Sequence, residues 1–111
     1  MTGHLVVLST VARAEDAERI GRALVEAGLA ACVNVLPAVT SIYRWKGTLE
    51  KEEERLLLIK TRADRFDALK QALVALHPYE VPEVVALPIA DGHQPYLDWL
   101  DESVAGKPAG T

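Results

Sequence analysis

The segment 77–83 carries the side chains with the clearest potential for chemistry, because it combines an imidazole, a phenol and two carboxylates with two prolines that fix the backbone. A rigid loop that presents His77 and Glu83 could bind a borderline divalent cation such as Cu(II) or Zn(II). A structural explanation is simpler: His77 ends a helix, and the prolines stop that helix and begin the next strand. A protein site for such a metal needs three or four ligands, and only two or three are visible, so the segment alone favours the structural explanation.

Aromatic residues form a second group with possible chemistry, since all except Phe66 gather in three short clusters along the chain. Tyrosine and tryptophan are typical of interfaces, because they combine a large apolar area with a polar tip. They could also line a pocket in which Arg44 or Lys60 binds an anion. Interface packing is favoured, and a pocket and an interface can coincide where subunits meet. The clustered residues are Tyr43, Trp45, Tyr79, Tyr96 and Trp99.

Composition excludes several classes of function. The 111 residues are 50% hydrophobic, and 12 Lys and Arg against 16 Asp and Glu give a net charge of −4. Without a basic surplus, neither nucleic acid nor an anionic membrane surface is an expected partner. No apolar run is long enough to span a bilayer, and no signal peptide is recognisable, so the expected compartment is the cytoplasm. The single Cys32 cannot form a disulfide within the chain, and its apolar surroundings indicate an inert strand residue.

The elements that must position these residues alternate between strands and helices. Apolar spacing predicts a first helix over about 14–27. A second helix is expected to begin at a capping box of Thr61 and Asp64 and to end at His77. Pro95 is expected in the first turn of a third helix, which has Tyr96, Trp99 and Leu100 on one side. Strands are expected at 4–9, 29–45, 48–59 and 84–89, with a hairpin tip at 45–48 and a solvated charge run at 50–55. This order predicts an α+β, ferredoxin-like split β-α-β (βαββαβ) fold with an added C-terminal helix. We expect one domain over 1–104 and a flexible tail over 105–111.

Proline distinguishes the central strands from the edge strands. The runs 5–8 and 56–59 contain none, whereas the other two strands contain Pro37 and Pro88, which an edge tolerates. The edge run 30–36 is apolar and has no lysine that would block further pairing. Because such an edge would aggregate if left bare, we expect a homo-oligomer joined through the edge strands.

Five short motifs follow one another along the chain, at 29–34 (LAACVN), 41–47 (SIYRWKG), 60–61 (KT), 77–83 (HPYEVPE) and 96–100 (YLDWL). With these motifs in this order, the chain resembles a known family, the CutA divalent-cation tolerance family. The resemblance extends over about 5–103 and implies a ferredoxin-like subunit in a homotrimer of the PII type, with edge strands extended across subunits. It further implies a cytoplasmic protein linked to tolerance of copper and other divalent metals, without an established reaction.

The resemblance also assigns residues to sites. His77 and Glu83 are implied as contacts of a weakly bound Cu(II) or other divalent ion. Some relatives carry a cysteine where this chain has Ser9, and a hydroxyl is a poor ligand for soft Cu(I), so we expect no thiolate-type copper site there. The cleft between subunits is implied to contain Tyr43, Trp45, Lys60, Tyr79 and Trp99.

Two other classes of function remain open. One is a PII-like sensor that binds a small anionic molecule at the subunit junctions, with Lys60 as the charge partner. The other is an enzyme that uses His77 as acid or base and Glu80 or Glu83 to orient it. No nucleophile or cofactor motif accompanies these residues, so we expect no enzyme.

Overall fold

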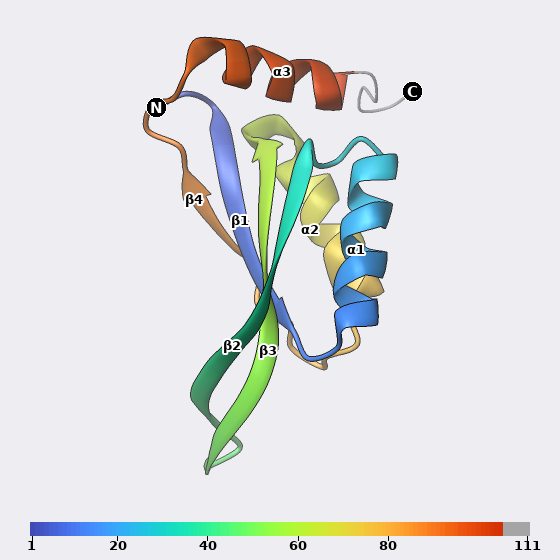
Figure 1. Cartoon of the computed structure of the whole chain (residues 1–111), viewed down its shortest axis with the longest axis vertical. Helices are drawn as coiled ribbons and strands as arrows, with labels where there is room; N and C mark the ends of the chain where they lie inside the picture. Colours follow the sequence, from blue (N-terminus) through green and yellow to red (C-terminus); the bar gives the residue numbers. More distant parts are fainter. Residues whose placement is uncertain (106–111) are drawn as a thin grey trace.

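A four-stranded antiparallel sheet in the order β2-β3-β1-β4 forms the framework of the protein. The computed structural model describes residues 1–105. Helices α1 and α2 lie on one face of the sheet and α3 crosses one end of it (Figure 1). The predicted ferredoxin-like order is confirmed, with β2 and β4 at the edges. The elements are β1 (His4–Val11), α1 (Ala14–Glu26), β2 (Cys32–Trp45), β3 (Thr48–Arg62), a 3-10 turn (Ala63–Arg65), α2 (Phe66–Leu76), β4 (Val85–Pro88) and α3 (Gln94–Ala105).

Two predicted boundaries are wrong. Thr61 does not cap α2: it pairs with Leu5 as a residue of β3, and its buried hydroxyl donates to the Leu29 carbonyl at 2.7 Å. Pairing with β1 therefore outweighs the local capping pattern, and the 3-10 turn leads into α2 instead. At the other end, Ala105 belongs to α3 rather than to the predicted tail, and residues 106–111 lie outside the described part of the chain.

The core lies between the sheet and the two helices α1 and α2. Alternate residues of each strand face the helices, because side chains in a strand have a period of two. Ile59 stands at the centre of this face, fully buried, with Val7 and Val33 as its neighbours on the adjacent strands. The other fully buried apolar residues of the cluster are Val11, Ala17, Ile20, Leu24, Leu57, Leu69 and Leu73.

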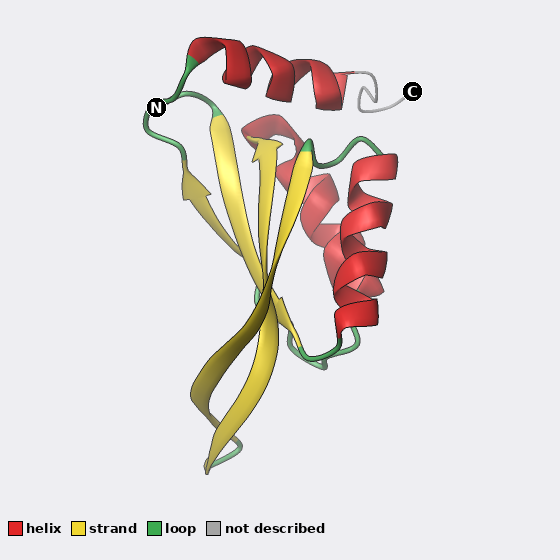
Figure 2. Cartoon of the chain, in the orientation of Figure 1, coloured by secondary structure: helices red, strands yellow, loops and turns green. Residues whose placement is uncertain are grey.

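The opposite face of the sheet is apolar and stays open over most of its length. Leu58 and Leu8 are paired there and are half-buried, and Val85 and Leu87 of β4 are 46% and 47% exposed. Figure 2 shows both α1 and α2 on the other side of the sheet, so neither of these helices covers this face. We call this surface, formed by Val6, Leu8, Leu56, Leu58, Val85 and Leu87, the open face.

The hairpin of β2 and β3 extends well beyond the rest of the sheet (Figure 1). An irregularity lies between Leu36 and Val39, where Pro37 interrupts regular pairing as an edge strand allows. At the tip, Lys46 and Gly47 both have positive φ angles, 50° and 82°, the geometry of a tight two-residue hairpin turn. This extended part of the β2–β3 hairpin, which we call the hairpin arm, therefore lies away from the helices.

Helix α3 docks on the end of the sheet through apolar and ionic contacts. Leu100 and Val104 form a small buried cluster with Ala31, and the buried His4 ring lies 2.9 Å from Asp101 through Nε2. Of the three residues predicted on one side of α3, only Leu100 is buried, and the aromatic pair Tyr96 and Trp99 is exposed. None of the helices in residues 1–105 has the length and apolar character needed to cross a membrane.

Two buried hydroxyls on the helix-facing side of the sheet should respond oppositely to their removal. Within the described residues 1–105, the Ser9 hydroxyl has no hydrogen-bond partner, whereas the Thr61 hydroxyl donates to the Leu29 carbonyl. We expect Ser9→Ala to raise the free energy of unfolding by about 1 kcal/mol and Thr61→Val to lower it by about 1–2 kcal/mol. Urea denaturation measures both, and a loss of stability in Ser9→Ala would show that this hydroxyl has a partner.

Candidate functional site: an acidic, aromatic cleft

A cleft of about 740 Å³ lies between the hairpin arm, the end of β1 and the segment after α2. Its side chains come from three parts of the chain that the fold brings together. We call it the acidic cleft, because its lining contains four glutamates and no lysine, arginine or histidine. The lining consists of Thr10, Ala12, Ser41, Ile42, Tyr43, Trp45, Glu52, Glu54, Tyr79, Glu80, Val81 and Glu83.

Glu54 and Tyr79 form the buried part of the acidic cleft. The Tyr79 hydroxyl donates to Glu54 Oε2 at 2.5 Å, and Glu54 is only 4% exposed. A buried carboxylate is normally compensated by a cation. Within residues 1–105, no lysine, arginine or histidine forms an ion pair with Glu54. The cleft therefore holds a negative charge that a single phenolic hydrogen bond satisfies only in part.

His77 anchors the segment after α2 and does not line the acidic cleft. Its Nδ1 accepts the Tyr79 backbone N–H at 3.1 Å, so the ring proton of the neutral form lies on Nε2, which donates to the Thr10 carbonyl at 2.8 Å. The His77 ring also meets the Tyr79 ring edge-on, at 4.5 Å between centroids. Both ring nitrogens are thus in use, and a metal ion could reach His77 only by displacing one of these bonds.

Glu83, the other predicted metal contact, does line the acidic cleft. It is exposed, and its Oε1 lies 3.5 Å from the Thr10 hydroxyl. Among the described residues, no group of three or more His, Cys, Asp or Glu side chains is arranged to hold a metal ion. The donors of one chain therefore do not complete a resident copper or zinc site, which needs three or four protein ligands.

An ammonium group already lies at the rim of the acidic cleft. Lys46 at the hairpin tip places its Nζ 3.6 Å from Glu80 Oε2 and 5.5 Å from the centroid of the Trp45 ring. Trp45 and Lys46 are neighbours at the hairpin tip, whereas Glu80 belongs to the segment after α2, and the side chains of Lys46 and Glu80 are largely exposed. The contact combines a carboxylate with an aromatic face, the two groups that bind organic cations in proteins.

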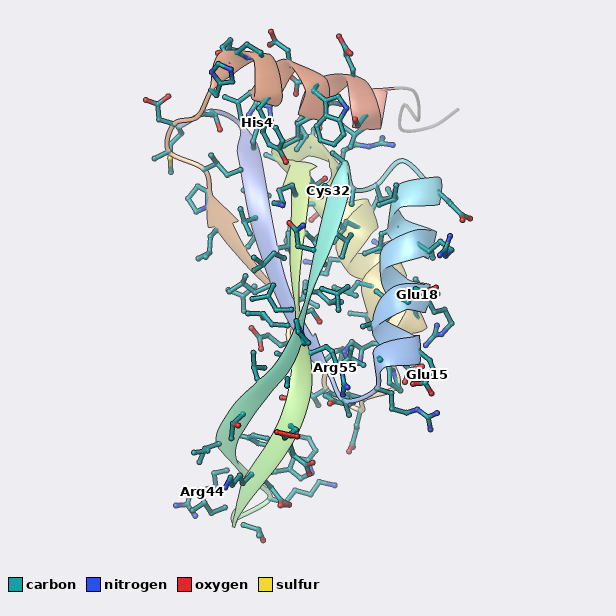
Figure 3. The ribbon with its side chains drawn as sticks, viewed as in Figure 1. His4, Glu15, Glu18, Cys32, Arg44 and Arg55 are labelled. Atoms are coloured by element: carbon teal, nitrogen blue, oxygen red, sulfur yellow. The ribbon has the colours of Figure 1, made fainter. Side chains whose placement is uncertain are left out.

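Two of the five predicted cleft residues lie elsewhere. Lys60 donates to Asn34 and lies 3.8 Å from the Cys32 sulfur. Figure 3 shows Cys32 near α3 and Arg44, the neighbour of Trp45, far away near the hairpin tip. Trp99 lies on α3 and packs on Tyr96 at 5.5 Å between ring centroids. Of the five predicted cleft residues, one chain therefore brings only Tyr43, Trp45 and Tyr79 together in the acidic cleft.

Sequence reasoning missed the glutamates of the hairpin arm. The charge run 50–55 predicts a solvated arm, yet Glu52 and Glu54 both line the acidic cleft. Glu50 pairs with Tyr43, which places Glu50, Glu52 and Glu54 on the same side of the strand as that cleft residue. Glutamates at 50, 52 and 54 recur at every second position of the run, and this strand spacing is the signal that could have found them, although Glu53 also lies in the run.

Burial and the neighbouring carboxylates both raise the pKa values of the two tyrosines in the acidic cleft. Burial and then the hydrogen bond to Glu54 raise the pKa of Tyr79 well above its usual 10.0. The pKa of Tyr43 is also raised, first by desolvation and then by Glu52, Glu54 and Glu50. Both phenols therefore report the carboxylates around them.

We expect Tyr79 to resist ionisation at alkaline pH. Its folded pKa exceeds the unfolded value of 10.0, so its contribution to stability is complete below pH 10.0 and is lost as pH rises further. Ultraviolet titration should show that one of the three tyrosines ionises at a higher pH than the other two. The Tyr79→Phe variant should lack this last ionisation step. Loss of an earlier step in Tyr79→Phe would contradict the Glu54 contact.

Comparisons with known proteins agree with the family that the sequence resembles. The family model described as CutA1 divalent ion tolerance protein matches residues 5–103. The Divalent-cation tolerance protein CutA of Thermus thermophilus is 57% identical over 98 residues, 88% of this chain and 95% of that protein. A solved structure of Cut A1 from the same organism has a TM-score of 0.88 at 56% identity, covering 90% of this chain and 97% of that one.

More distant relatives carry names that differ in compartment. Protein CutA 1, chloroplastic, of Oryza sativa is 44% identical over 99 residues, which are 89% of this chain and 56% of that protein. The structure titled periplasmic divalent cation tolerance protein CutA, from Archaeoglobus fulgidus, is 39% identical with a TM-score of 0.88, covering 91% of this chain and 98% of that one. These names describe tolerance and name no reaction. The match of one family model across nearly the whole chain, together with these relatives, shows that the chain belongs to the CutA1 divalent ion tolerance protein family.

Proposed function

We propose that this protein acts in divalent-cation tolerance as a homotrimer that binds divalent cations, Cu(II) among them, reversibly at the acidic cleft. The observation that carries the proposal is the lining of that cleft, in which four carboxylates occur with no lysine, arginine or histidine. Carboxylate oxygens attract divalent cations, and the partly compensated Glu54 adds to the negative potential of the site.

The exposed carboxylates Glu80 and Glu83 are the proposed first contacts of the cation. Glu54 lies deeper and is engaged by Tyr79, so it acts through its charge. We assign His77 to anchoring Tyr79 and the end of β1, because both of its ring nitrogens are in use. A site with so few free donors fits an exchangeable cation that keeps part of its water shell or takes further ligands from a neighbouring subunit.

The homotrimer is supported by two apolar surfaces that a single chain leaves uncovered. Edge strand β2 has exposed apolar residues such as Val35, 42% exposed, and the open face adds Val85 and Leu87. Bare apolar edges and large apolar patches are typical of surfaces that another chain covers. In such an assembly Lys60 and Trp99 of one subunit could approach the acidic cleft of another, which is where the family resemblance implies them.

An anionic ligand is the alternative that the sequence left open, and the cleft disfavours it. Lys60, its expected charge partner, lies outside the acidic cleft of its own chain, and the lining glutamates would repel an anion. The cytoplasm stays our proposed compartment. The compartment names of relatives vary, so cell fractionation of the native host is the measurement that decides it.

Calorimetric titration of the assembled protein with Cu(II) in a non-coordinating buffer tests the proposal. We expect saturable binding that weakens about tenfold or more when Glu80→Gln and Glu83→Gln are combined, because two charged ligands are lost. The matched control combines Glu18→Gln and Glu26→Gln on α1, two exposed glutamates outside the acidic cleft, and should keep the wild-type affinity. Equal affinities in the two double variants would refute the proposed site.

A further inference from the structure

We propose that the acidic cleft also binds organic ammonium ions, specifically primary alkylamines, and that the Lys46 side chain competes with them for its rim. The inference rests on the proposed cation-binding function of the same cleft and names an additional class of ligand. It depends on the aromatic residues of the cleft, which a metal ion does not need. The two proposals can therefore be separated by experiment.

The Lys46 contact is the first observation behind this inference. Its Nζ is a primary alkylammonium held 3.6 Å from Glu80 Oε2 and 5.5 Å from the Trp45 ring centroid. An ammonium ion within about 6 Å of a tryptophan centroid is attracted by the negative face of the ring. The chain thus shows with its own side chain how an alkylammonium group would bind at this rim.

The interior of the acidic cleft supplies a second, independent observation. Glu54 is 96% shielded from solvent, accepts one hydrogen bond from Tyr79, and forms no ion pair with a cationic side chain within residues 1–105. Tyr43 and Tyr79 contribute aromatic surface around it. A cation that enters the cleft would supply the missing counter-charge to Glu54, and an alkyl chain would lie along the apolar and aromatic walls.

The chemistry of the cleft lining suits an alkylamine. A cavity of about 740 Å³ accommodates a small alkylamine, which can place its ammonium group between carboxylates and its alkyl chain against Ile42 and Val81. These two side chains are 68% and 66% exposed and gain contact area from such a ligand. Neutral or anionic analogues lack the charge that the glutamates and the Trp45 face select.

Lys46 is expected to lower the affinity of the cleft for amines, because it occupies Glu80 and Trp45 itself. Removing its charge should free both groups and also remove a repulsive positive charge. Lys51 provides the matched control, since it lies on the same hairpin, is exposed, and does not line the cleft. A comparison of the two lysines separates competition at the rim from a general change in net charge.

Calorimetry of the assembled protein with n-butylammonium chloride, against sodium butyrate and n-butanol at constant ionic strength, tests the inference. We expect binding of the amine alone, tightened about threefold or more by Lys46→Met but not by Lys51→Met. Trp45→Leu should weaken amine binding about fivefold, because the aromatic face beside the ammonium group is lost. An equal gain in affinity for n-butylammonium in Lys46→Met and Lys51→Met would overturn the inference. An unchanged amine affinity in Trp45→Leu would also overturn it.

The same titrations separate this inference from the proposed function. Binding of Mn(II) with no binding of n-butylammonium would overturn the amine ligand and leave the divalent-cation site standing. Binding of n-butylammonium with no binding of Mn(II) would support the amine ligand and contradict the proposed function. Loss of binding in a variant counts only if circular dichroism shows that the variant is folded, and Trp45→Phe, which keeps an aromatic face, should restore most of the amine affinity.

Discussion

Ile59→Ala is expected to lower the free energy of unfolding by about 2–5 kcal/mol, the largest single loss of stability that we predict. Ile59 is fully buried at the centre of the helix-facing side of β3, between Val7 and Val33 on the neighbouring strands. Truncation leaves a cavity in a rigid sheet that cannot easily collapse. Denaturant unfolding measures the change.

The control for Ile59→Ala is the same type of truncation on the free hairpin arm. Ile42 is 68% exposed, so Ile42→Ala should change the free energy of unfolding by no more than about 0.5 kcal/mol. A loss of less than about 1 kcal/mol in Ile59→Ala would mean that the core does not lie where we place it.

Leu58→Glu is expected to dissociate the proposed homotrimer without unfolding the subunit. Leu58 is adjacent to Ile59 but points to the open face, where it pairs with Leu8 and Asn34. A charge in the middle of an apolar contact between subunits would be buried without a partner. Light scattering should show the mass falling from that of three chains to that of one, 12.1 kDa, while circular dichroism stays unchanged.

Val74→Glu is the matched control for assembly. Val74 is an apolar residue of α2 that is 48% exposed and lies on a helix, away from the open face. The same substitution there should leave the trimer intact. A wild-type protein that scatters as a monomer, or a Leu58→Glu variant that stays a trimer, would refute assembly through the open face.

Much of the fold could be predicted because local and global signals agree. The apolar runs in β1 and β3 contain no proline and become the central strands, whereas Pro37 and Pro88 mark the two edges. The spacing of Thr61 to Asp64 fits a helix cap, so the local pattern predicts a helix start where Thr61 is in fact a residue of β3. Its pairing with Leu5 continues the strand, and no local pattern reveals a partner more than fifty residues away.

The site was harder to predict, because its residues meet only through the folded hairpin. The motif at 77–83 contains Tyr79 and Glu83, which line the acidic cleft, but it gives no sign that both nitrogens of His77 bond to the backbone. Glu54 belongs to a charge run whose composition favours a solvated strand, whereas in the fold it is 4% exposed and accepts a hydrogen bond from Tyr79. Long-range contacts of this kind decide which carboxylates share a cleft.

The central claim is that divalent cations bind at the acidic cleft, and anomalous diffraction from crystals soaked in Cu(II) tests it most directly. We predict a copper peak coordinated by the carboxylate of Glu80 or Glu83 and absent from crystals of the variant that combines Glu80→Gln and Glu83→Gln. A peak that persists unchanged in that variant, or copper bound only outside the acidic cleft, would contradict the account.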